Sequence, residues 1–216
     1  MKKIAVVLAG NGVFDGAEIH EATLTMYSIV KHGATYEIFA PNINQHHVIN
    51  HITGEEMPEK RNVMVEAARI ARGKINDLAD FKASDFDALI FPGGFGVAKN
   101  LCSFAFDGIE CAIDQDVGNA IKNMIQLKKP IGALCIAPVL LAKILNDVEL
   151  TIGQDQNTAQ AIKTMGAKHI ETTHGEVVID KKYNIVTTPC YMLDANIVQI
   201  AKGANNVVIA ILNLCK

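Results

Sequence analysis

The chain has 216 residues, of which 50% are hydrophobic and 20% charged, and its formal net charge is -3. A chain of this length can bury a substantial core, so we expect one α/β domain over residues 1–216. Lys and Arg are dispersed along the sequence, so composition gives no support to binding of nucleic acid or of an anionic membrane surface, and we expect neither partner.

The N-terminal apolar run, Ile4 to Ala9, stops at Gly10 and is too short for a membrane span, which needs about 20 apolar residues, or for a secretory signal. We therefore interpret it as a buried strand and expect a cytoplasmic protein. The five cysteines form no CxxC pair, so we expect free thiols in a reducing compartment.

Strand-like apolar runs alternate with helical patterns along the chain. In chain order, we expect strands at 3–8, 35–40, 86–91, 130–134, 149–152, 176–179 and 185–188, and helices at 17–32, 62–72, 117–127, 137–145, 158–165 and 194–214. Continuous apolar strands separated by helices predict a mostly parallel sheet with helices on both faces. The last two strands are close enough for a small hairpin, and residues 42–60 have the irregular pattern of an insertion loop.

A strand-to-helix turn presents Cys135, in the segment Gly132-Ala133-Leu134-Cys135-Ile136-Ala137-Pro138. Its small neighbours suit a tight elbow like that of the hydrolase nucleophile, with Cys in place of Ser. The positive end of the following helix favours a thiolate. The alternative is a small buried hydrophobic residue.

A second strand runs into Pro92-Gly93-Gly94-Phe95-Gly96. Consecutive glycines let backbone N–H groups face a ligand at the carboxyl end of a strand. The N–H groups of Gly94 and Ile136, with Gly93 beside them, are therefore candidates for an oxyanion hole. The alternative is an ordinary tight turn.

Two glutamates, Glu18 and Glu21, share a face at the start of the first helix. The helix dipole accounts for Glu18. Glu21 lies one turn deeper beside apolar neighbours, where a carboxylate is suited to share a proton with a thiol and set its pKa.

Three other patterns carry less weight. The glycines from Gly10 to Gly16 lack the spacing of a dinucleotide fingerprint, and His46, His47 and His51 fit exposed loop residues better than metal ligands. We therefore expect neither cofactor nor metal. Cys190 also follows a strand, and it fits either simple packing, a pocket position or a resolving thiol.

Several longer motifs carry a family resemblance. The chain resembles the ElbB family of isoprenoid-biosynthesis (enhancing lycopene biosynthesis) proteins, within the ThiJ/PfpI superfamily with its class I glutamine-amidotransferase-like fold. The motifs that carry the resemblance are Gly12-Val13-Phe14-Asp15-Gly16-Ala17-Glu18-Ile19-His20-Glu21, Arg61-Asn62-Val63 with Ala68-Arg69-Ile70, Pro92-Gly93-Gly94-Phe95-Gly96-Val97-Ala98-Lys99-Asn100-Leu101, Cys135-Ile136-Ala137-Pro138 and Thr187-Thr188-Pro189-Cys190-Tyr191-Met192.

The resemblance implies a flavodoxin-like three-layer sandwich, a homodimer, and pairing of Cys135 with Glu21. It also implies glyoxalase-type conversion of glyoxal to glycolate without glutathione or metal, and possible deglycation of protein adducts. Many superfamily members place a histidine near the nucleophile. The corresponding segment here, residues 151–155, has none, and His169 and His174 lie farther along the chain.

The leading hypothesis is thus a glyoxalase-like enzyme (a lyase) acting on a small dicarbonyl. Cys135 attacks the aldehyde, Glu21 relays the proton between the substrate carbons, and Gly94 and Ile136 stabilise the oxyanion. One alternative is a thiol-based stress sensor or holdase chaperone with incidental turnover. Another is a glutamine-amidotransferase subunit, which requires the missing histidine.

Overall fold

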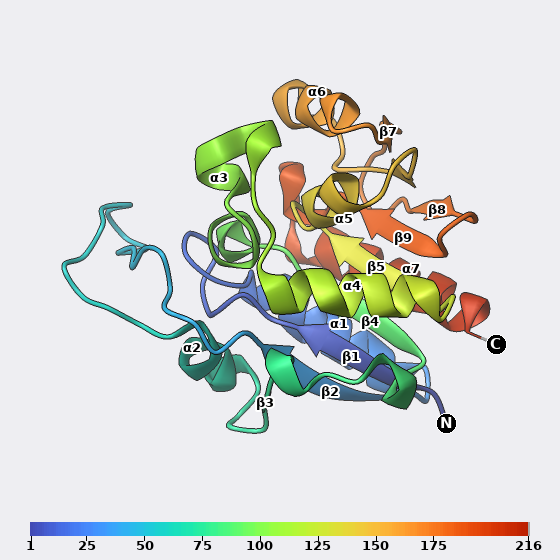
Figure 1. Ribbon diagram of the computed structural model, residues 1–216, viewed down its shortest axis with the longest axis horizontal. Coiled ribbons are helices and arrows are strands. Elements are labelled where there is room, and N and C mark those ends of the chain that lie inside the picture. Colours follow the sequence, from blue (N-terminus) through green and yellow to red (C-terminus); the bar gives the residue numbers. More distant parts are fainter. Residues whose placement is uncertain (216) are drawn as a thin grey trace.

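A seven-stranded sheet forms the centre of the molecule, in a computed structural model that describes residues 1–215 (Figure 1). All neighbouring strands are parallel except the last pair, in which β8 runs antiparallel to β9. This confirms the predicted α/β fold and its small hairpin. In spatial order the strands are β3 (Asn76–Asp77), β2 (Thr35–Ala40), β1 (Lys3–Val7), β4 (Ala88–Phe91), β5 (Ile131–Leu134), β9 (Ile185–Thr188) and β8 (Val178–Asp180).

Helices cover both faces of this sheet (Figure 1). Alternate residues of β1 point to opposite faces, so that Val7 belongs to one hydrophobic core and Val6 to the other. The Val6 face is covered by α1 (Ile19–Lys31), α2 (Val63–Ile70) and α7 (Ile197–Leu214), and the Val7 face by α4 (Gln115–Gln126), α5 (Pro138–Ile144) and α6 (Gln156–Thr164).

The longest helix, α7, is apolar enough to cross a membrane by length and composition alone. Its Ile200, Val207 and Ile211 side chains are nevertheless fully buried in the core beneath the sheet. A long apolar stripe is what a helix needs when it packs along a sheet of this width. We interpret α7 as a core helix.

Helix boundaries follow local capping. The Glu18 side chain accepts a hydrogen bond from the backbone N–H of Glu21 at the start of α1, and Gly33 takes a φ of 74° just past its end. At α7, Asn196 and Gln199 form a reciprocal capping box, so the helix begins three residues after the predicted position.

Several short elements were not predicted from the sequence pattern. These are β3, β7 (Lys168–His169), the helix α3 (Phe104–Asp107) and a π-helix at Val97–Leu101. The strand predicted at 149–152 is present as the shorter β6 (Glu149–Leu150), which pairs with β7 in a separate two-stranded parallel sheet. Two-residue strands contain too little alternation to be recognised. The loop predicted at 42–60 has only isolated bridges, such as Asn44 with Asn62.

The carboxyl ends of β1, β4, β5 and β9 meet at one edge of the sheet, beside the point where the strand order reverses between β1 and β4. Ligands bind at such switch points in doubly wound folds. Backbone hydrogen bonds join the loops after β1 and β4 here, from Phe95 N to Val13 O at 2.8 Å and from Gly96 N to Gly16 O at 2.9 Å. A rigid frame therefore surrounds the predicted site.

Candidate active site

Cys135 lies at a sharp turn between β5 and α5. Its φ is 59°, in the left-handed region that residues other than glycine seldom occupy, and its N–H donates to Thr188 O of β9 at 3.0 Å. A strained backbone at a strand end is characteristic of functional positions. A side chain on Gly132 would come within 3.0 Å of Val207, which explains the small residue before the turn.

Glu21 approaches Cys135 from the first turn of α1. Its side chain is fully buried, with Oε2 accepting from Gly93 N at 2.8 Å and Oε1 from Tyr191 N at 3.2 Å. The Glu21 carboxyl also forms a hydrogen bond with the Cys135 thiol. Segments distant in sequence, from α1, β4, β5 and β9, therefore converge on one buried acid.

The glycine loop lets these groups come together. A Cβ at Gly93 would collide with Cys135 Cβ and lie 2.7 Å from Glu21 Oε2, so this position admits no side chain. Gly94 has a φ of 101°. Its N–H and that of Ile136 both donate to the Cys135 sulfur. The structure thus brings together all five residues proposed from the sequence.

Burial dominates the electrostatics of the Cys135–Glu21 pair. Burial, reinforced by the charge of Glu18, raises the pKa of Glu21 from 4.5 to about 8, although two backbone N–H groups oppose the shift. Burial and the neighbouring Glu21 carboxylate also raise the pKa of the Cys135 thiol well above its ordinary value. The expectation that the helix terminus favours a thiolate is therefore wrong for the resting site, because desolvation outweighs the N–H donors. A carboxylate that ionises at about pH 8 is instead suited to accept the thiol proton.

A cavity of about 350 Å³ opens onto Cys135. Its walls are mainly apolar, with a few polar groups that suit a small polar substrate. Glu18 lines this cavity, whereas Glu21 is fully buried and is not part of the wall. The lining residues are Val13, Glu18, Gly94, Phe95, Ala98, Phe104, Ala105, Cys135, Ile136, Asp155, Thr158, Tyr191 and Met192.

Four polar residues of this wall were missed by sequence reasoning. Glu18 was explained by the helix dipole alone, and Asp155, Thr158 and Tyr191 were given no role. Asp155 caps α6 through Thr158 N at 2.7 Å, so its position follows from a helix start signal. Tyr191 follows the turn after β9, and that strand end was the available signal.

Other candidate residues occupy structural positions. Cys190 is 3% exposed and does not line the cavity; its sulfur packs against α7, where a Cβ added at Gly203 would lie 3.1 Å from it. His169 accepts a hydrogen bond from Ile152 N at 3.3 Å and so supports the backbone of the 151–155 segment. Over residues 1–215, no cluster of three His, Cys, Asp or Glu side chains is arranged to hold a metal.

The loop histidines contact aromatic and acidic neighbours. His46 stacks on Phe106 with ring centroids 4.0 Å apart, and His51 Nε2 accepts from Phe14 N at 3.2 Å.

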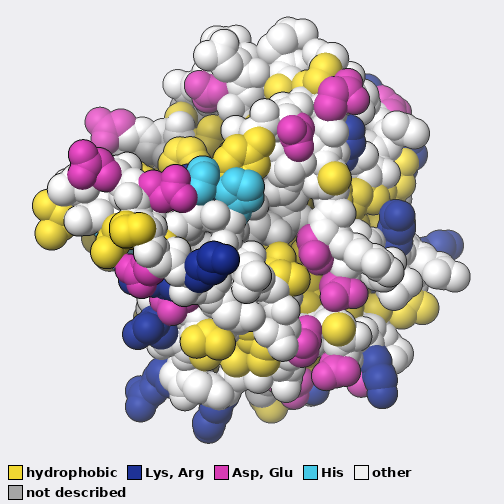
Figure 2. Space-filling view, turned by 60° about the vertical axis from the view of Figure 1, so that its left-hand side comes forward, with side chains coloured by type: hydrophobic (Ala, Val, Ile, Leu, Met, Phe, Trp, Pro, Cys, Tyr) yellow, Lys and Arg dark blue, Asp and Glu magenta, His cyan; other side chains and the backbone are white. Residues whose placement is uncertain are grey.

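Charged side chains of both signs intermingle on the face shown in Figure 2, where Lys and Arg form no continuous patch. This distribution agrees with the dispersed charge of the sequence.

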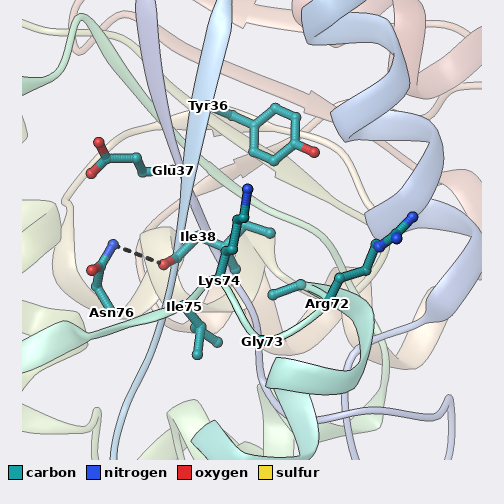
Figure 3. A pocket seen from close by; sticks show the side chains of 9 residues that line it. Tyr36, Glu37, Ile38, Arg72, Gly73, Lys74, Ile75 and Asn76 are labelled. Atoms are coloured by element: carbon teal, nitrogen blue, oxygen red, sulfur yellow. Dashed lines mark hydrogen bonds between the residues drawn. The ribbon is translucent and has the colours of Figure 1, made fainter.

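A larger hollow, of about 750 Å³, lies at the outer edge of the sheet (Figure 3). It is formed by the first half of β2, including Tyr36 and Glu37, and by the turn from Ala71 to Asn76. The first half of β2 belongs to the amino-terminal edge of the sheet, opposite Cys135. Its lining has no cysteine or histidine, so the smaller cavity at Cys135 is the better candidate for a catalytic site.

Comparison with known proteins identifies a matching family and similar chains. The chain matches the DJ-1/PfpI family over residues 2–195. It is 46% identical over 222 residues to human "Glutamine amidotransferase-like class 1 domain-containing protein 3, mitochondrial", covering 98% of this chain and 83% of that protein. It is 38% identical over 210 residues to the zebrafish "ES1 protein, mitochondrial", covering 89% of this chain and 78% of that protein.

A solved structure shares the whole fold. The crystal structure of an isoprenoid biosynthesis protein with amidotransferase-like domain from Ehrlichia chaffeensis superposes with a TM-score of 0.93. The two sequences are 38% identical, and the match covers 100% of both chains. The arrangement of strands and helices around Cys135 is therefore shared with an experimentally determined protein.

The comparison corrects one expectation. Both of these curated relatives are named as mitochondrial proteins, so the expectation of a cytoplasmic protein is wrong on this finding. That expectation depended on the shortness of the apolar run at Ile4–Ala9. Such a run bears on secretion and membrane insertion, whereas mitochondrial targeting segments are amphipathic and rich in Arg and Ser.

Proposed function

The chain belongs to the DJ-1/PfpI family, and from that premise we propose that it is a cofactor-independent, glyoxalase-like enzyme of the ElbB type. Its substrate in this proposal is glyoxal or a similar small dicarbonyl, free or as a protein adduct. The observation that carries the proposal is a strained thiol, Cys135, hydrogen-bonded to a buried acid and open to a small cavity.

The reaction begins with proton transfer from the Cys135 thiol to the Glu21 carboxylate. The sulfur then forms a bond to one aldehyde carbon, whose carbonyl electron pair moves to oxygen, and this oxygen takes up a proton from solvent to give a hemithioacetal. Hydrogen moves from this carbon to the second one, which leaves a hydroxyacyl thioester. Water cleaves the thioester, releasing glycolate and restoring the thiol. The net change is addition of one water to glyoxal.

The backbone around the sulfur supports the first step. The N–H groups of Gly94 and Ile136 already point at Cys135 Sγ, so an oxygen that develops on the adjacent carbon has donors nearby. Because the pKa of Glu21 is raised to about 8, an increasing share of it is ionised and able to accept the thiol proton as pH rises toward 8. Glu21 lies outside the cavity wall, however, so its predicted role between the substrate carbons receives no support.

The test is glycolate formation from glyoxal by the wild type and by Cys135→Ala and Glu21→Gln variants. We expect the first variant to be inactive and the second to lose at least about 100-fold, as expected for removal of a proton-transfer group. Cys215→Ala is the matched control, because Cys215 is a half-buried thiol whose sulfur contacts Asp87 O. Undiminished turnover by Cys135→Ala would refute the mechanism.

The two alternatives receive less support from the site. A peroxide sensor needs an accessible thiolate, whereas Cys135 is 7% exposed and its pKa is raised. A glutamine amidotransferase needs a histidine at the thiol, and the cavity wall contains none among residues 1–215. Selective peroxide oxidation of Cys135 without dicarbonyl turnover would favour the sensor.

A homodimer is the assembly that we propose for this enzyme. The family resemblance supports it, and aromatic side chains at Phe14, Phe95 and Phe106 are 38%, 51% and 43% exposed. Sedimentation analysis of the purified protein tests the assembly directly. A single species with the mass of one chain would refute it.

A further inference from the structure

The proposed reaction requires a second acid–base group that reaches the substrate. Hydrogen must leave one carbon and arrive at the next, and Glu21 is fully buried and does not line the cavity. Both Glu21 oxygens are also engaged by backbone N–H groups. A different group must therefore touch the substrate carbons.

Glu18 has the position that this step needs. Its side chain is 10% exposed and lines the cavity together with Cys135. One oxygen, Oε2, is held by Glu21 N at 2.7 Å, which fixes the carboxylate in place. The other, Oε1, accepts no hydrogen bond in the described part of the chain, and the nearest basic group is His20 Nδ1 at 3.9 Å.

His20 lies close to Glu18 and is open to solvent. Its side chain is 50% exposed, and Nδ1 makes a 2.8 Å hydrogen bond with the hydroxyl of Tyr191, which also lines the cavity. Burial and the charges of Glu18 and Glu21 raise the pKa of Tyr191, so its hydroxyl keeps its proton and orients the imidazole. Imidazole is the side chain most often used to shuttle protons.

We propose that Glu18 is the catalytic base that moves hydrogen between the substrate carbons, and that His20, positioned by Tyr191, exchanges the Glu18 proton with solvent. This rests on the proposed glyoxalase function and adds a proton route to it. Glu18 removes the proton from the first carbon of the hemithioacetal, leaving an enediolate whose negative charge lies on the oxygen of the second carbon. Glu18 then returns a proton to the second carbon, the hydroxyl proton of the first carbon's oxygen passes to the second oxygen, and the first carbon–oxygen bond becomes the thioester carbonyl.

The route predicts an isotopic signature. If Glu18 exchanges its proton with solvent through His20 before returning it, turnover in D₂O places deuterium on carbon 2 of glycolate. Without His20 the same hydrogen is returned more often, so deuterium content falls. NMR of the product measures this content independently of the overall rate.

The variants are Glu18→Gln, His20→Ala and Tyr191→Phe. Gln keeps an oxygen that caps α1, so we expect Glu18→Gln to fold and to lose about 10² to 10⁴-fold in turnover. We expect His20→Ala to lose about tenfold in turnover and to yield glycolate with less deuterium. Added imidazole should restore both, because free imidazole can replace a proton shuttle but cannot replace a structural contact of the side chain. Tyr191→Phe should show a smaller change in the same direction.

His32→Ala is the matched control, since His32 ends the same helix and contacts Asn205 instead. Wild-type turnover by Glu18→Gln overturns the role of Glu18. Wild-type deuterium content in His20→Ala, or a loss that imidazole does not restore, overturns the shuttle. Either result leaves a Cys135-dependent glyoxalase intact, whereas absence of glycolate from the wild type overturns both proposals.

Discussion

Replacing Glu21 with glutamine should remove a loss of stability that the wild type undergoes as pH rises, although the replacement also removes activity. The pKa of Glu21 is about 8 in the folded protein and 4.5 for an ordinary glutamate. The folded state therefore binds more protons than the unfolded state between these values, and the free energy of unfolding falls as pH rises through this window. Glutamine does not titrate, so the variant lacks this loss.

The size of the effect follows from the shift. Each pKa unit corresponds to about 1.36 kcal/mol, so the full shift amounts to about 5 kcal/mol, of which about 3 to 4 kcal/mol falls between pH 5 and pH 8. The amide also disturbs one of the two backbone hydrogen bonds, at Gly93 or Tyr191. That loss is independent of pH, so it cancels when the stability of the variant at pH 8 is compared with its own stability at pH 5.

The assay is urea unfolding of the wild type and of Glu21→Gln at pH 5 and at pH 8. We expect the wild type to lose about 3 to 4 kcal/mol more than the variant over this interval. Cys135 does not obscure the result, because its pKa is raised well above the interval. Equal pH dependence in the two proteins would mean that Glu21 ionises normally, and the argument from burial would be refuted.

Three further predictions concern the same site. Wild-type kcat/KM should rise with pH up to about 8 as Glu21 ionises, and a profile flat from pH 6 to 9 would contradict its role as base. Gly93→Ala should lose activity and cost about 1–3 kcal/mol in urea unfolding, because its Cβ would collide with Cys135; full activity would show that the loop adjusts. Cys135→Gly should be about 1 kcal/mol more stable than Cys135→Ala because φ is 59°, and thermal melting in the reverse order would argue against strain at the elbow.

Local pattern was sufficient for the longer elements. The strand at Thr35–Ala40 agrees with its prediction at both ends, and α1 and α4 agree to within a few residues. These segments have apolar runs or helical periodicity, together with capping residues or glycine at their ends. The β3 strand, by contrast, is defined by its pairing with β2, Asn76 with Phe39 and Asp77 with Ala40, which no local pattern records.

The residues of the site also fall into two groups, those that local sequence pattern predicts and those that it does not. Cys135, Gly93 and Gly94 were predicted because a strand end followed by small residues is visible in sequence. The pocket positions of Glu18 and Tyr191 were not, because they depend on how the start of α1 meets the end of β9. The direction of the Cys135 pKa shift was also missed, since burial is a property of the packed site rather than of the turn.

The sequence by itself determined that a thiol lies on a tight turn at the carboxyl edge of an α/β sheet, because apolar runs, glycines and small residues dictate local backbone geometry. Only the tertiary structure decided which carboxylate does what. Glu18 and Glu21 are one helical turn apart and chemically identical, yet packing buries Glu21 completely and places Glu18 on the cavity wall. Desolvation and access to substrate arise from contacts between distant segments, and these contacts separate the two roles.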